Sequence, residues 1–159
     1  MRGSQRRRLQ PEDSGAPSAA GWGLTCDSTR TAPSVTNGVT LRYPLHWHAD
    51  QSSDGTQVVL RQPGSPTDRP IPTISVSFEP GVVVTQPPAA DGMSTPEAIT
   101  FAGLQGWEYH QVGLVVPSAA DFIDLPYRGG RLHISATCAP TVNLVPQMKE
   151  ILKTLQAAP

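Results

Sequence analysis

The chain has 159 residues, a formal net charge of −1 at pH 7 and 16% charged residues. This length suits one domain, and a charge so close to zero gives no reason to expect a nucleic acid partner. No run reaches the roughly 18 apolar residues of a membrane-spanning helix, so no transmembrane segment is expected.

Residues 1–36 differ in composition from the rest of the chain. They are rich in Ser, Pro, Ala, Gly and Arg and show no apolar periodicity, which is typical of disorder. The cluster Arg6–Arg8 is followed by polar and small residues in place of a continuous apolar core, so a signal peptide is not predicted. We therefore expect a disordered segment over 1–36 and a single folded domain over 37–157.

Three strand-like runs open this domain, and a mixed region follows them. Apolar and polar residues alternate over 39–43, 57–62 and 73–79, as they do on half-buried strands. The inward residues are expected to be Val39, Leu41, Tyr43, Val58, Leu60, Ile74, Val76 and Phe78. Thr95-Pro96-Glu97 resembles a helix cap with proline at the first helical position, which predicts a short helix through about Ala102. A further strand is predicted from Trp107 to Val116.

The runs DFIDLPY (121–127) and RLHISATC (131–138) predict a β-hairpin. If Gly129-Gly130 is its two-residue loop, the apolar residues face one another on one side of the sheet. The expected pairs are Tyr127 with Leu132, Leu125 with Ile134, Ile123 with Ala136, Asp124 with Ser135, and Phe122 with Thr137. Pro126 then falls opposite His133 at a hydrogen-bonded site, which predicts a broken ladder or an edge strand.

The last element is an amphipathic helix. Asn143 is a suitable N-cap, and Pro146 falls in the first turn, where a missing N–H costs little. The apolar residues recur at helical spacing and form one stripe, consisting of Leu144, Met148, Ile151, Leu152 and Leu155. In chain order, the elements predict an antiparallel sheet covered by helices.

Three segments resemble the PsbP-like superfamily. They are GVTLRYPLHW, with Tyr43, Pro44 and Trp47 at an aromatic-Pro-x-x-Trp corner, then GLQGWEYHQVGLVV, and finally RLHISATCAPTVNLVPQMKEILKTL. The resemblance covers about residues 37–156. It implies an α+β fold: an α-β-α sandwich with a central antiparallel sheet of about six strands and a C-terminal amphipathic helix. Members such as PsbP and LpqN-type envelope lipoproteins use this scaffold for different partners, so the resemblance implies no single function and carries no functional residue onto this chain.

Two pairs of residues are candidates for contact with a ligand or partner. His46 and His48 flank Trp47, and on an extended segment they would project to the same side about 7 Å apart. A metal site needs three or four ligands, and no other ligand lies at a familiar spacing, so a structural corner is the preferred interpretation. Arg128 and Arg131 flank the Gly-Gly loop and could contact an anion or a partner. No catalytic residue and no cofactor are predicted, because no oriented nucleophile is recognisable.

Cys26 and Cys138 could form a disulfide in an oxidising compartment. We predict a non-enzymatic accessory or binding protein that acts on a protein or envelope partner. An exported or envelope location is favoured, and a cytoplasmic one is compatible with the sequence. One alternative is a cytosolic secretion-chaperone-like module that binds an apolar client segment. A second alternative is a small metal-dependent enzyme that uses His46 and His48.

Overall fold

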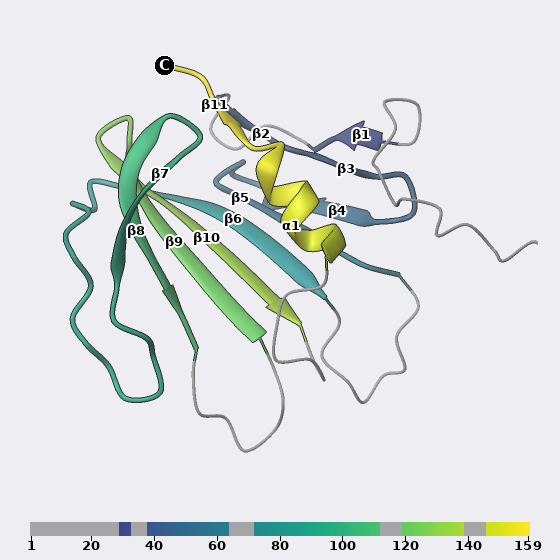
Figure 1. Cartoon of the computed structure of the whole chain (residues 1–159). Helices are drawn as coiled ribbons and strands as arrows, with labels where there is room; N and C mark the ends of the chain where they lie inside the picture. Colours follow the sequence, from purple (N-terminus) through teal and green to yellow (C-terminus); the bar gives the residue numbers. More distant parts are fainter. Residues whose placement is uncertain (1–28, 33–37, 64–71, 112–118, 139–145) are drawn as a thin grey trace, which may run out of the picture.

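The computed structural model describes residues 29–32, 38–63, 72–111, 119–138 and 146–159 (Figure 1). The strands are β1 (Thr29–Thr31), β2 (Val39–Thr40), β3 (Arg42–Pro44), β4 (His48–Gln51), β5 (Gln57–Arg61), β6 (Thr73–Pro80), β7 (Glu97–Phe101), β8 (Leu104–His110), β9 (Ala119–Tyr127), β10 (Gly130–Cys138) and β11 (Gln156–Ala157). The helix within these residues is α1 (Pro146–Lys153).

Seven of the strands form one antiparallel sheet in the order β4-β5-β6-β10-β9-β8-β7. Two further pairs, β1 with β3 and β11 with β2, form small two-stranded sheets. Helix α1 and these short strands lie over the same face of the large sheet (Figure 1). The sheet therefore has one covered face, which we call the core face, and one face away from the helix, which we call the open face.

The expected α-β-α sandwich with a central sheet of about six strands is wrong. The described residues are mostly β-structure, with seven strands in the main sheet and a single helix. The predicted helix after Pro96 is the main source of the error, because Glu97–Phe101 is strand β7. This run contains Ile99, Thr100 and Phe101, which favour strands. A tight turn at Ala102 and Gly103, with φ angles of 50° and 79°, returns the chain into β8.

The β9–β10 hairpin is real, but its predicted register is wrong by two residues. The turn residues are Arg128 and Gly129, with φ angles of 43° and 73°, and Tyr127 pairs with Gly130. Gly130 belongs to the strand, where a side chain would overlap the main-chain oxygen of Glu79 and the Phe78 ring. A shift of two residues keeps every side chain on its predicted face, because the strand period is two.

The corrected register also explains Pro126. It faces Arg131, one pair away from the hydrogen-bonded Tyr127–Gly130 pair, so its missing N–H removes no bond to β10. Its nitrogen points instead toward β8, and the β8–β9 ladder ends at Asp124. The proline therefore marks the end of that ladder.

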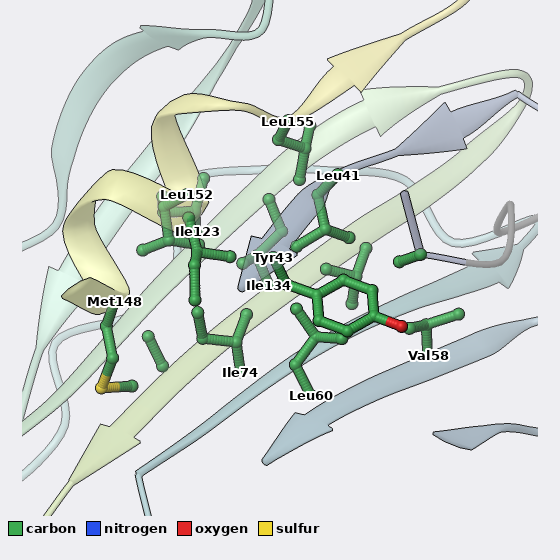
Figure 2. Packing of buried hydrophobic residues seen from close by; sticks show 14 of the residues in the cluster. Leu41, Tyr43, Val58, Leu60, Ile74, Ile123, Ile134, Met148, Leu152 and Leu155 are labelled. Carbon is green, nitrogen blue, oxygen red and sulfur yellow. The ribbon is translucent and has the colours of Figure 1, made fainter. Parts of the chain in front are cut away.

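The predicted inward residues form the core. Met148, Ile151, Leu152 and Leu155 of the C-terminal segment are buried against side chains of the main sheet and of β2–β3, as Figure 2 shows. The sheet residues of this core include Val39, Leu41, Tyr43, Val58, Leu60, Ile74, Val76, Ile123, Leu125, Leu132 and Ile134. Burying an aliphatic side chain of this size is worth about 1.5–3 kcal/mol. Pro146 is the first helical residue, as predicted, whereas Asn143 and Leu144 lie outside the described residues.

The start of the described chain touches the fold. Thr29–Thr31 pairs with β3, and the Ala32 amide donates to the Leu41 oxygen at 2.8 Å. These residues fall in the segment predicted to be disordered, and the rest of residues 1–36 lies outside the described part. No helix in the described ranges has the length and apolar content to cross a membrane.

Candidate functional site

The open face carries the polar half of the alternating strands. Its central residues, from β6 to β8, are Ser75, Ser77, Glu79, Arg131, His133, Ser135, Phe122, Asp124, Trp107 and Tyr109. Asp124 is the one buried charged side chain among the described residues, with 3% of its surface exposed. Because a buried carboxylate is costly unless it is paired, its surroundings are the first place to look for a built site.

Strand register brings three partners to this carboxylate. Asp124 lies opposite His133 on one side and opposite Trp107 on the other. His133 Nδ1 lies 2.7 Å from Asp124 Oδ1, and the Tyr109 hydroxyl donates to Oδ2 at 3.1 Å. Arg131 Nη1 lies 3.7 Å from the same Oδ2. Both carboxylate oxygens are therefore engaged by groups from neighbouring strands.

Arg131 links the carboxylate to a second one. Its Nε and Nη2 donate to Oε2 of Glu79 at 3.0 and 2.6 Å. Partial burial opposes the charged form of Arg131, but the hydrogen bonds that it donates to Glu79 and the negative charges of Asp124 and Glu79 outweigh this effect and raise its pKa. We call the set Glu79, Tyr109, Phe122, Asp124, Arg131 and His133 the Asp124 cluster.

The titration of the cluster follows from these contacts. Burial alone would raise the pKa of Asp124, but the His133 hydrogen bond, the positive charges of His133 and Arg131 and the Tyr109 hydroxyl lower it below its usual value. Burial, and then the charge and hydrogen bond of Asp124, raise the pKa of Tyr109 to about 12. At neutral pH the cluster therefore holds an ionised carboxylate and a protonated phenol.

Aromatic rings continue the cluster across three strands. Tyr109 and Phe122 stack with ring centroids 5.3 Å apart and planes at 19°, and Phe122 and His133 stack at 6.1 Å and 23°. Phe122 lies between the other two rings, so both faces of its ring are covered by Tyr109 and His133. The row therefore presents ring edges outward, where a flat platform for stacking a base or a sugar would present faces.

The Asp124–His133 contact resembles the carboxylate–imidazole half of a catalytic triad. A triad also needs a hydroxyl nucleophile on the second imidazole nitrogen. Ser77 lies directly opposite His133 on β6, but its hydroxyl is directed to the main-chain oxygen of His133 at 3.5 Å. In this geometry Asp124 orients the His133 imidazole, but the imidazole does not activate the Ser77 hydroxyl.

The corner that carries His46 and His48 is a turn, not an extended segment. The Trp47 amide donates to the Pro44 oxygen at 2.9 Å, and the indole N–H donates to Gln147 Oε1 at 3.0 Å. Trp47 is 2% exposed and belongs to the core, whereas both histidines are exposed. Across the described ranges no three His, Cys, Asp or Glu side chains form a group that could hold a metal ion.

The two arginines of the hairpin contact different parts of the structure. The Arg128 guanidinium lies 5.2 Å from the Tyr127 ring centre, and its Nη2 donates to the Pro159 oxygen at 2.9 Å. Arg131 lies in the Asp124 cluster. The structure therefore does not bring them together as one anion site.

The predicted disulfide remains a prediction. Cys138 ends β10 and is buried in the core, with 2% of its surface exposed. Cys26 lies outside the described residues.

Sequence reasoning missed the pairing of Asp124 with His133. Both residues were placed on the polar face of the hairpin, but the register put Asp124 opposite Ser135. A turn at Arg128-Gly129 would have placed Asp124 opposite His133. The sequence therefore allowed this pairing to be predicted, provided that Arg128-Gly129 was taken as the turn in place of Gly129-Gly130.

Comparison with known proteins adds a likeness of fold. No family model and no curated protein matches the sequence. A crystal structure of a protein from Bacteroides thetaiotaomicron VPI-5482, at 1.50 Å resolution, is similar with a TM-score of 0.54 and 12% sequence identity. The match covers 83% of this chain and 49% of that one, so this chain spans about half the length of its structural neighbour. The PsbP-like resemblance is not tested by this likeness and stays a prediction.

Proposed function

We propose that this protein is a non-enzymatic binding protein that holds a protein partner on the open face of its sheet. The observation that supports this most is the Asp124 cluster itself. A buried carboxylate, a guanidinium, an imidazole and a phenol are fixed against one another on the face away from the helix. Such a rigid polar centre loses little side-chain entropy when a partner covers it.

Internal pairing favours binding over catalysis. Both oxygens of Asp124 accept contacts from within the cluster, and two nitrogens of Arg131 donate to Glu79. Asp124 has a lowered pKa and Tyr109 a raised one, so neither shift moves a group toward neutral pH, where a general acid or base works best.

The chemistry of the face favours a protein over other partners. Tyr, Trp, Phe and Arg are enriched at the centres of protein interfaces, and this face offers half-buried Trp107, Tyr109, Phe122 and Arg131. The two carboxylates of Glu79 and Asp124 lie beside a single arginine and would repel the phosphate backbone of a nucleic acid. The stacked rings present edges, which disfavours base or sugar stacking.

Affinity capture from the source cell with matched variants tests the proposal. Ser135 lies on β10 of the open face, next to Phe122 across the sheet, so Ser135→Arg places a bulky charge on this face. His46→Arg adds the same side chain at the exposed corner. A protein recovered by the wild type and by His46→Arg, but lost with Ser135→Arg, supports the proposal. With the purified partner we expect a loss of at least about tenfold in affinity, which corresponds to about 1.4 kcal/mol.

Other outcomes support the alternatives. A partner lost with His46→Arg and retained by Ser135→Arg would move the binding site to the corner and overturn the proposal. A bound metal that is lost when His46 and His48 are both replaced by Gln would favour the metal-dependent enzyme. Capture of clients through apolar segments, unaffected by Ser135→Arg, would favour the chaperone-like function.

A further inference from the structure

The two outer strands of the main sheet differ in how they are protected. β4 carries charged and polar side chains, and its Asp50 forms an ion pair with Arg61. β7, with the sequence EAITF, has one charged residue at its first position and contains neither lysine nor proline. Unprotected edges of this kind are the usual sites of strand addition.

The β7–β8 hairpin fixes which backbone groups face outward. Its two-residue turn makes Phe101 and Leu104 a hydrogen-bonded pair, so the Ile99–Gly106 pair is hydrogen-bonded as well. Ala98 and Thr100 occupy the intervening pairs and direct their N–H and C=O groups away from β8. Within the described residues these four groups have no hydrogen-bond partner.

A shallow pocket lies beside these outward groups. Its volume is about 390 Å³, and it is lined by Ala98, Ile99, Thr100, Gln105, Gly106 and Trp107. Three of these residues are consecutive on the edge strand β7, and the other three are consecutive on β8. A strand added to β7 would bring its own side chains to this pocket, as in other cases of β-strand addition.

The same chain contains a segment suited to this edge. Val82–Thr85 follows β6 without regular secondary structure and consists of four β-branched residues. Val83 is 81% exposed and Val82 37%. Within the described part of the chain, residues 82–89 form no hydrogen bond to other residues. The surrounding run 80–90 has no charged residue, so covering it would desolvate no charge.

The segment and the edge lie at the same end of the sheet. The Gly81 amide bonds the Gly129 oxygen at 3.0 Å, which fixes the start of the segment at the β9–β10 turn. Because β8 and β9 are antiparallel neighbours, the β7–β8 turn lies at that same end (Figure 1). A two-fold axis beside β7 could therefore bring the segment of each copy to the edge of the other.

We infer that two copies of this chain associate by exchanging strands: Val82–Thr85 of one copy pairs with the outward backbone of Ala98 and Thr100 of the other. The valine side chains then cover the pocket beside Trp107. Two identical ladders form, because a two-fold interface uses each surface twice. The exchanged segments cover the Trp107 margin of the open face and none of the Asp124 cluster, so a failure of this inference would leave the proposed partner site untouched.

Sedimentation velocity over a range of protein concentrations tests the inference. We expect the wild type to form a dimer, and Val83→Asp to be monomeric at concentrations where the wild type associates. Leu45→Asp is the matched control, because Leu45 is a large apolar residue that is 48% exposed and lies in the β3–β4 turn. It should leave the dimer intact. A wild type that stays monomeric, or a dimer that survives Val83→Asp, would overturn the inference.

A second variant tests the acceptor edge. Thr100→Pro removes an outward N–H without removing a bond to β8, and we expect it to abolish the dimer. Its circular dichroism and thermal unfolding are compared with those of the wild type. A mixture of Val83→Asp and Thr100→Pro should form a heterodimer, because one copy retains an intact edge and the other an intact segment. Two variants that fail to associate with each other would contradict strand exchange even if each one alone is monomeric.

Discussion

The two faces of the main sheet are built from the same strands, yet they are specified differently. On the core face Leu125, Leu132 and Ile134 are at most 1% exposed and gain stability by burial, which does not depend on direction. On the open face Asp124 and His133 are stable only through contacts with particular partners. On the core face, one apolar residue can replace another of similar volume with a small loss of stability. On the open face, the effect of a substitution depends on the hydrogen bonds and ion pairs that the residue forms with its neighbours.

The largest expected effect comes from a truncation on the core face. Ile134→Ala should lower the free energy of unfolding by about 2–5 kcal/mol, because it removes buried methyl groups and leaves a cavity. Its neighbour Ser135 points to the open face, and Ser135→Ala should change stability by no more than about 0.5 kcal/mol. Urea unfolding of both variants measures the difference. Equal effects would show that both faces are buried to the same degree.

The next effect comes from the centre of the open face. Asp124→Asn keeps the shape of the side chain but removes its charge, and we expect a loss of about 1–3 kcal/mol because polar partners are left poorly paired. The folded pKa of Asp124 lies below the ordinary value of 3.8, so its contribution is present above about pH 4 and is lost as the pH falls through the folded pKa.

Unfolding at a series of acidic pH values checks this sign. The stability difference between the wild type and Asp124→Asn should shrink as the pH is lowered below the ordinary carboxyl pKa. A difference that stays constant down to the lowest pH at which the protein folds would show that the charge of Asp124 is not what stabilises the cluster.

The same contrast explains how far the sequence could predict the fold. Alternation of side chains placed Ile123, Leu125 and Ile134 on the core face correctly, because a pattern of period two does not depend on which strand is the partner. It could not pair Asp124 with His133, because that contact depends on register. Register followed from the turn, and Arg128 in a left-handed conformation beside Gly129 was less expected than a Gly-Gly turn.

The missed strand has a related cause. Local signals around Pro96 match a helix start, and a five-residue run is too short to show a clear period. Pairing with β8 through the turn at Ala102 and Gly103 decided the outcome, so tertiary context outweighed the local pattern. The Asp124 cluster draws its residues from β6, β8, β9 and β10, so the order of these strands had to be known before the whole cluster could be assembled.

A smaller effect is expected at the rim of the cluster. Tyr109→Phe removes one hydrogen bond to Asp124 and should cost about 0.5–1.5 kcal/mol. The pKa of Tyr109 is raised to about 12 from 10.0, so its contribution is present below pH 10 and is lost as the pH rises through 12.

Absorbance titration of the three tyrosines of the chain measures this pKa. The phenol that titrates near pH 12 should disappear from the curve in Tyr109→Phe. In Asp124→Asn the same phenol should titrate at lower pH, because the negative charge that opposes its ionisation is gone. An unchanged titration in Asp124→Asn would separate Tyr109 from the carboxylate.

The smallest effect is expected from an ion pair outside the cluster. Arg61 and Asp50 join the edge strand β4 to β5, and their side chains are 47% and 65% exposed. Arg61→Ala should therefore lower the free energy of unfolding by about 0–1 kcal/mol, and added salt should reduce even that difference.

Arg131→Ala removes a guanidinium that is only 30% exposed and contacts Asp124, whose side chain is 4% exposed. The loss of stability should therefore be larger than in Arg61→Ala and less sensitive to salt. Unfolding at low and high ionic strength compares the two variants directly. If both arginines cost the same and respond equally to salt, Asp124 is solvated in solution and the open face has no rigid polar centre.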